Sequence, residues 1–291
     1  MLDLRPATLD DMPAVVELLG ARESADFGQS NITEALLRGW WAEEPDAIRW
    51  LAWLEGRCAG YARLFDDGAV AAEVHDESCT HPELEGRGVG SALFDRLEEQ
   101  AREKAFLEIR ATAWTETGRA FLHDRGYRYL ESFWRMEAEL TDAPPSPRPP
   151  AGYVLDGYRE HEDDEALYAC ATAAGGDWAG AASLELWRRQ RHSRADYDPR
   201  GWAVARVAGG IAGGVLAFPL AGNAWILDVF VAPEHQHRGL GEALMLDCFR
   251  RLRDLGCTHA GLEVDAQNAI RLYERVGMRV TRRYDVHEKA L

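Results

Sequence analysis

The sequence repeats one glycine-containing segment at two places that lie 151 residues apart. PELEGRGVGSAL occupies residues 82–93, and PEHQHRGLGEAL occupies residues 233–244. The same spacing of 151 separates Gly126 in DRGYRY from Gly277 in RVGMRV. A constant spacing that joins a proline, a loop and a distant glycine seldom arises by chance. The chain is therefore interpreted as an internal duplication.

A proline-rich segment divides the two copies. Residues 141–150, TDAPPSPRPP, hold five prolines. Because proline fixes φ and lacks an N–H donor, we expect a stiff linker rather than a helix or a central strand. The predicted organisation is an N-terminal domain over residues 1–140, the linker over 141–150 and a C-terminal domain over 151–291.

The sequence pattern predicts the same order of elements in both halves. An opening strand and helix are followed by paired strands and then by the glycine loop at the start of a helix. A further strand, a helix and a last strand follow. In the helix after the second loop, apolar residues recur at helical spacing, at Leu244, Cys248, Leu252 and Leu255. This order predicts an α/β fold in which each half is a mixed, mostly antiparallel sheet flanked by helices.

Charge and composition narrow the function. The formal net charge of −16 argues against a nucleic-acid partner. Residues 1–140 carry −13 of this charge and residues 141–291 carry −3. The acidic residues of the first half make its surface soluble or, alternatively, attract a cationic substrate. The uncharged segment 209–226 contains Pro219 and five glycines, which favours a hairpin over a membrane helix.

The cysteines and the N-terminus predict a cytoplasmic protein. The five cysteines form no CxxC pair, as expected of reduced thiols. The N-terminal residues MLDLRPATLDD include acids and no apolar run, unlike a signal peptide.

The repeated loop has the chemistry of a phosphate site. Glycine lets a ligand approach the backbone closely, and the free amides and dipole of the following helix favour a diphosphate. The second loop lacks the lysine and Ser/Thr of a Walker loop, and Ala243 stands where a dinucleotide fingerprint has its last glycine. A turn that binds no ligand is the alternative.

The second half resembles the GNAT acyltransferase superfamily. Gln236, Gly239 and Gly241 fill the family loop Gln/Arg-x-x-Gly-x-Gly/Ala. The family's later Asn, Ala, Tyr and Gly-Phe are matched by Asn268, Ala269, Tyr273 and Gly277-Met278. The first half resembles the family more weakly, so the chain looks like a tandem GNAT protein.

The resemblance implies an N-acetyltransferase that uses acetyl-CoA and a primary amine of a small molecule, without a metal. Tyr273 would protonate the leaving thiolate; the alternative is a core aromatic. Asp228 would hold or deprotonate the amine, with Glu263 as the alternative base; both acids could instead lie at an edge or on the surface. The implied cofactor site comprises Phe230, Val231, Gln236, His237, Arg238, Gly239, Leu240, Gly241, Glu242, Asn268 and Tyr273.

The first half departs from the family pattern. Glu85 stands at the position of Gln236, Leu122 at that of Tyr273, and Thr117 at that of Asn268. We therefore expect a non-catalytic half with a possible second cofactor site at Arg87, Gly88, Val89 and Gly90.

Several alternatives remain at this point. Without turnover, the chain would be a CoA-binding regulatory or scaffold protein. Among enzymes, the layout is similar to that of mycothiol synthase, a tandem GNAT enzyme. The acceptor pocket is expected to involve the tryptophan-rich segments 37–44 and 184–190. The chain is expected to be a monomer or a homodimer, with no membrane partner.

Overall fold

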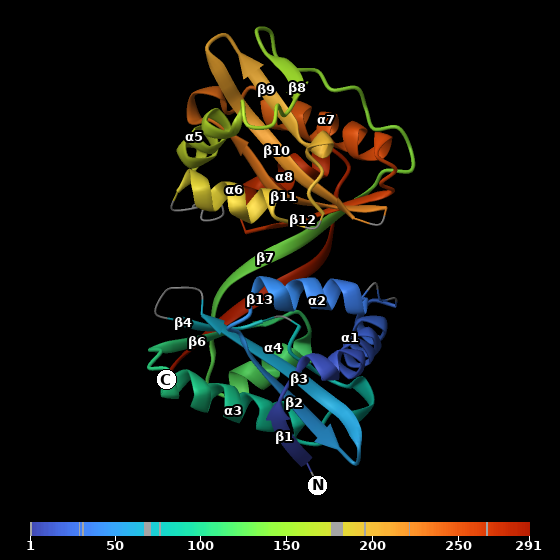
Figure 1. Cartoon of the computed structure of the whole chain (residues 1–291), viewed down its shortest axis with the longest axis vertical. Helices are drawn as coiled ribbons and strands as arrows, with labels where there is room; N and C mark the ends of the chain where they lie inside the picture. Colours follow the sequence, from blue (N-terminus) through green and yellow to red (C-terminus); the bar gives the residue numbers. More distant parts are fainter. Residues whose placement is uncertain are drawn as a thin grey trace. The chain divides into compact units, whose positions relative to one another are not determined.

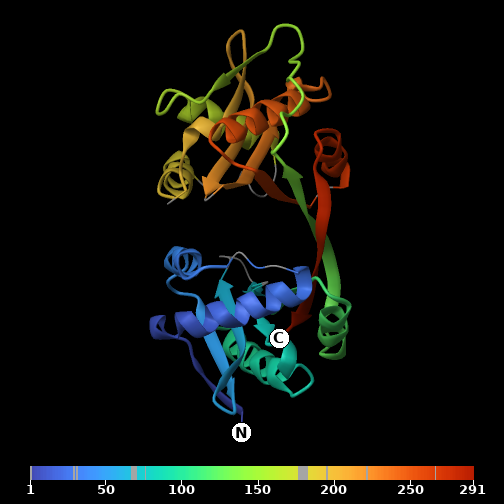
Figure 2. The same ribbon diagram turned by 90° about the vertical axis from the view of Figure 1, so that its right-hand side faces the viewer.

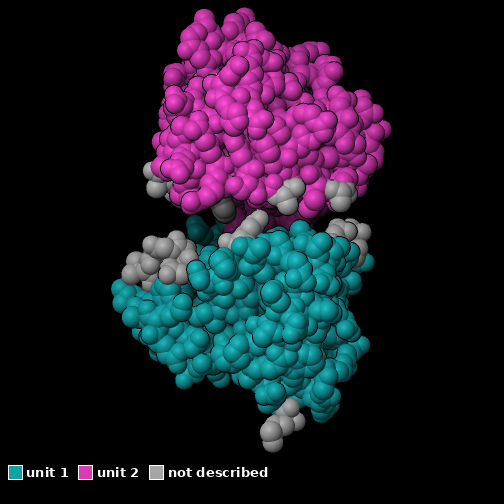
Figure 3. Space-filling view, viewed as in Figure 1, with its two compact units in different colours: residues 1–132, 284–291 teal, residues 133–283 magenta. Residues whose placement is uncertain are grey.

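A computed structural model of the chain forms two compact units (Figure 1; Figure 3). It describes residues 2–28, 30, 32–66, 71–75, 77–175, 183–194, 196–220, 222–265 and 267–291, without the side chains of Glu43, Asp66, Gln267 and Asn268. Unit 1 comprises residues 1–132 and 284–291, and unit 2 comprises residues 133–283. Among the described helices, none is long and apolar enough to cross a membrane.

Unit 1 is built on a mixed sheet with helices on both faces. Its strand order is β1-β2-β3-β4-β6-β13, with β5 paired to β3; β4 and β6 run parallel, and the other pairs between its described strands are antiparallel. The elements are β1 (Leu2–Pro6), α1 (Met12–Phe27), α2 (Glu34–Glu43), β2 (Ile48–Leu54), β3 (Arg57–Asp66), β4 (Ala71–Val74), β5 (Cys79–Thr80), α3 (Val89–Glu103), β6 (Glu108–Ala113), α4 (Glu116–Asp124) and β7 (Arg128–Glu139), which continues into unit 2.

Unit 2 has the same architecture. Its strand order is β7-β12-β11-β10-β9-β8, in which β11 and β12 run parallel and the other pairs are antiparallel. The elements are β8 (Val154–Gly157), α5 (Asp164–Ala174), α6 (Leu184–His192), β9 (Ala203–Val207), β10 (Gly210–Leu220), β11 (Asn223–Val231), α7 (Leu240–Asp254), β12 (His259–Val264), α8 (Gln267–Arg275) and β13 (Arg279–Ala290), which continues into unit 1. The predicted fold class is confirmed, and the uncharged segment forms the hairpin β10–β11.

The last strand of each unit comes from the other half of the sequence. In unit 1, β6 pairs with residues 285–290 of β13, and in unit 2, β12 pairs with residues 134–139 of β7. Side chains reinforce the first exchange, since Lys289 Nζ donates to the buried Glu98 carboxylate at 2.8 Å. Figure 2 shows both long strands, β7 in green and β13 in red. The compact units therefore differ from the sequence ranges 1–140 and 151–291 by this exchange.

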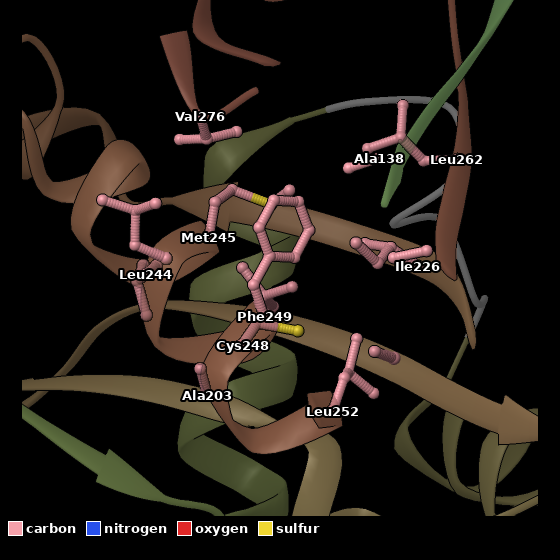
Figure 4. Packing of buried hydrophobic residues seen from close by; sticks show 14 of the residues in the cluster. Ala138, Ala203, Ile226, Leu244, Met245, Cys248, Phe249, Leu252, Leu262 and Val276 are labelled. Carbon is pink, nitrogen blue, oxygen red and sulfur yellow. The ribbon is translucent and has the colours of Figure 1, made fainter. Parts of the chain in front are cut away.

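The sheet of unit 2 has two differently packed faces. One face carries α7 and α8 over the larger cluster, which includes Ile226, Phe249 and Leu262; Figure 4 shows Phe249 within it. The strand β7 adds Met136 and Ala138 to this core, and Leu140, which directly follows the strand, belongs to it as well. The opposite face carries α5 and α6 over a second cluster, which is rich in aromatic residues and includes Trp187, Trp202 and Phe218. Residues of β11 alternate between these faces and so reach both.

Candidate functional site

The parallel strands β11 and β12 separate at one end. Their pairing joins Asn223, Ala224 and Trp225 to residues 259–261, and no later β11–β12 pair is recorded among the described residues. On its other side, β11 remains paired with β10 as far as Val231. A bulge at Leu227 interrupts this pairing, because Leu216 is opposite Asp228 and Ala217 is opposite Ile226. The later part of β11 therefore has backbone groups directed toward a gap in the ladder. Among the described residues, the two strands therefore diverge just after Trp225.

The glycine loop lies directly after β11 and ends at the N-terminus of α7. Gln236 Nε2 donates to the carbonyl of Val231 at 2.9 Å, and Arg238 Nη2 to that of Glu234 at 2.9 Å, so both side chains brace the loop. Within the described chain, the amides of residues 237–242 have no recorded backbone acceptor. Because Gly239, the N-cap, supplies no side-chain cap, these donors are available to an anion.

The glycines of this loop have different roles. Gly239 has φ +83°, a left-handed conformation, and a Cβ there would meet nothing within 4 Å. Glycine is needed at this position because of the left-handed backbone conformation, not because a side chain would clash. A Cβ on Gly241 would lie 3.3 Å from Leu272 Cδ2, so this glycine permits close packing of α7 on α8. His237 has φ +59°, and the first half has Gly86 at that position.

Tyr273 lies on α8 and is 7% exposed. Burial, followed by the charge of Asp265, raises the pKa of its phenol to about 12. Among the described residues, no hydrogen bond of its hydroxyl is recorded. The Leu122 side chain, 151 positions earlier, is buried in the core of unit 1. The backbone of Asn268 belongs to α8, but its side chain lies outside the description.

Asp228 forms a buried ion pair with Arg191 of α6. Arg191 Nε donates to Oδ2 at 2.9 Å and Nη2 to Oδ1 at 3.0 Å. Burial raises the pKa of Asp228, and the Arg191 guanidinium opposes this shift. Since both carboxylate oxygens are engaged, the geometry argues against Asp228 as the base. The sequence analysis missed Arg191, which occupies one of several arginine positions in LELWRRQRH and has no distinguishing local pattern.

Glu263 is exposed and lies on β12 opposite Arg135 of β7. Its neighbours Leu262 and Val264 belong to the core beneath α7 and α8, so Glu263 lies on the opposite face of the sheet. Trp187, from the segment expected at the acceptor pocket, is fully buried against Trp202 and Tyr168. It is therefore a core residue of unit 2.

The first half retains the loop with altered chemistry. Gly88 has φ +79° and caps α3, as Gly239 caps α7. The carboxylate of Glu85 accepts a hydrogen bond from Arg22 of α1, and Arg87 pairs with Glu55 at 3.3 Å. Among the described residues of the chain, no group of His, Cys, Asp or Glu is arranged to hold a metal.

Comparison with known proteins gives consistent matches. Residues 12–127 and 167–278 match the acetyltransferase (GNAT) family. A mycothiol acetyltransferase of Thermobispora bispora is 31% identical over 286 residues, 93% of each chain. One from Stackebrandtia nassauensis is 30% identical over 294 residues, 94% of each chain.

Two solved structures share the architecture. A GCN5-related N-acetyltransferase from Sphaerobacter thermophilus superposes with a TM-score of 0.89 at 26% identity, over 99% of this chain and 95% of that one. A tandem GNAT protein from the clavulanic acid biosynthesis pathway gives 0.79 at 21% identity, over 100% of this chain and 98% of that one, a likeness of fold. The chain belongs to the GNAT family, and it is an acyl-CoA-dependent N-acetyltransferase with two GNAT domains.

Proposed function

We propose that unit 2 is the catalytic half and binds acetyl-CoA. The observation that supports this most directly is the set of free amides at residues 237–242, located next to the gap between β11 and β12. The diphosphate would be held by the amides of residues 238–242 and the helix dipole of α7. The pantetheine arm would pair with the backbone edge of β11 that faces the gap near Phe230 and Val231, and an amide there would hold the thioester oxygen.

Tyr273 would act as the general acid. The departing CoA thiolate needs a proton, and a buried phenol with a raised pKa remains protonated at neutral pH. Asn268 would hydrogen-bond to the cofactor beside it, as the family resemblance implies. Leu122 offers no proton at the corresponding place, so the first half would be non-catalytic.

For the base, Glu263 is favoured over Asp228. The ion pair with Arg191 occupies both oxygens of Asp228 and buries them. Glu263 is exposed to solvent on the face of the sheet opposite α7 and α8. A carboxylate there can accept the amine proton directly or through one water. Replacing Glu263 by Gln should lower kcat at neutral pH, while Asp228→Asn would mainly affect stability.

The acceptor would be the amine of desacetylmycothiol. This choice of acceptor is based on the relatives, which are mycothiol acetyltransferases that match at about 30% identity over most of the chain. A small amine also agrees with the acidic character of the first half, which attracts cations.

The test has two stages. Calorimetry with acetyl-CoA should show binding that is lost when the Gly239 backbone conformation is disturbed. Release of CoA should then be followed with desacetylmycothiol, D-glucosamine and an amino-acid amide as acceptors. Binding without turnover of any amine would favour a CoA-binding regulatory protein. Binding that depends only on the first loop at residues 85–90 would reject the assignment to unit 2.

A further inference from the structure

Trp225 lies at the last paired position before β11 and β12 diverge. Its indole extends from β11 across β12 at Gly261, where a Cβ would come 3.0 Å from Trp225 Cζ3 and 3.3 Å from Cε3. Ala224 and Ala260, the adjacent pair, belong to the core beneath α7 and α8. The indole therefore lies on the opposite face of the sheet, the face that also bears Glu263.

A charged pair on β7 lies beside this indole. The Arg135 guanidinium carbon lies 5.0 Å from the centre of the Trp225 ring, and Arg135 Nε donates to Glu137 Oε1 at 2.8 Å. Arg135 is opposite Glu263 in the ladder and Glu137 is opposite Gly261, so the three charged residues share one face. The Arg135 and Glu137 side chains are 34% and 42% exposed, which leaves both accessible.

The chemistry of this cluster is that of a cation site. An aromatic ring face attracts a cation, and a carboxylate adds a charge-assisted hydrogen bond. Arg135 shows that a planar cation fits both partners at once. The cluster lies just before the gap proposed for the thioester, and Glu263 is the diagonal neighbour of Glu137 on the adjacent strand.

We propose that Trp225 and Glu137 form the binding site for the ammonium group of the acceptor, and that Arg135 competes with it for the same ring and carboxylate. The site thereby selects small cationic amines. Glu137 and Arg135 precede the proline linker in sequence, so the first half supplies acceptor-binding residues to the catalytic unit through the exchanged strand. This inference rests on the proposed function of unit 2.

The experiment uses the full chain at saturating acetyl-CoA, with desacetylmycothiol and D-glucosamine as acceptor amines. Glu137→Gln and Trp225→Ala should each raise the KM of the acceptor about ten-fold, the usual effect of losing one charge-assisted contact. The KM of acetyl-CoA should stay unchanged. Arg135→Met, which removes the competing cation, should lower the KM of the acceptor; a purely structural stack would not give that result.

Glu139→Gln is the matched control. Glu139 lies on the same strand and face, opposite His259 and further from the gap, so its KM values should equal those of the native chain. Unchanged acceptor KM in the Glu137 and Trp225 variants, an equal effect of Glu139→Gln, or a raised KM in Arg135→Met would each overturn the inference. So would failure of the native chain to bind either amine. The proposed function of unit 2 is still supported after any of these outcomes if acetyl-CoA binds and Glu263→Gln lowers kcat. If unit 2 does not bind acetyl-CoA, both the proposed function and this inference are wrong.

Discussion

Tyr273 combines burial with a hydroxyl that has no recorded bond to the described residues. A phenol kept in such surroundings is retained as a neutral donor, since ionisation would place an unscreened charge in the core. The corresponding first-half position is Leu122, which satisfies the packing requirement without the hydroxyl. Packing alone therefore does not require a tyrosine here.

Tyr273→Phe should lower kcat by about 10²-fold, because only the proton donor is lost. The KM of acetyl-CoA should change little. Steady-state kinetics with thiol detection would measure both. Tyr127→Phe is the control, since Tyr127 is a buried tyrosine of unit 1 that donates to Glu98 at 3.3 Å. It should leave kcat unchanged. Native kcat in Tyr273→Phe, with chemistry limiting the rate, would reject Tyr273 as the acid.

The pH dependence of kcat has a predicted sign. A donor acid is active while protonated, so activity that depends on Tyr273 is present below its pKa of about 12 and lost as pH rises through that value. Between pH 7 and 10 the profile should show no fall due to this phenol. Any loss across that range that disappears in Tyr273→Phe would contradict the assignment.

Gly239 and Gly88 test the two loops with the same change. Alanine in the left-handed region costs roughly 1–2 kcal/mol, and both glycines have φ near +80°. Gly239→Ala and Gly88→Ala should therefore lower the stability of their own units similarly. Only Gly239→Ala should weaken acetyl-CoA binding, as measured by calorimetry, and only this variant should lower turnover. Equal loss of turnover from both variants would mean that the first loop also serves the reaction.

At the level of elements, the sequence predicted most of unit 2. The helix predicted after the second glycine loop is α7, and the hairpin and the loop lie where the apolar runs and glycines predicted them. The ion pair of Asp228 with Arg191 was not predictable. It depends on the bulge at Leu227, which sets the face of Asp228, and on the rotation of α6, which selects one arginine among several.

This ion pair should be a structural element of β11 and α6. Arg191→Ala leaves a buried carboxylate without its partner and should cost about 3–5 kcal/mol in unfolding free energy. Arg191→Met combined with Asp228→Leu removes both charges and should be much closer to native stability. Chemical denaturation of the three proteins would measure this. If the double variant is folded yet has no turnover, Asp228 acts in catalysis after all.

At the scale of the whole chain, the duplication was visible in the sequence but the strand exchange was not. Residues 128–139 and 279–290 both show strand patterns, and either could complete either sheet. Local patterning specifies that a strand forms and which face is apolar; it does not specify a partner far away in the sequence. The pairing of β6 with β13 and of β12 with β7 is decided by tertiary contacts, such as that of Lys289 with Glu98.

The exchange predicts which fragment of the catalytic half can fold. Residues 133–283 retain residues 133–139 of β7 and Leu140 after it, and Met136, Ala138 and Leu140 belong to the core of unit 2. Residues 151–291 lack these side chains, leave β12 as an open edge and carry the last residues of β13 without their partner β6. Losing one buried methionine or leucine already costs about 2–5 kcal/mol, comparable to the whole stability of many domains. Fragment 133–283 should therefore unfold cooperatively in denaturant, and fragment 151–291 should aggregate or unfold without a sharp transition. Equal stability of the two fragments would show that β7 is dispensable and that the boundary at the proline linker separates independent domains.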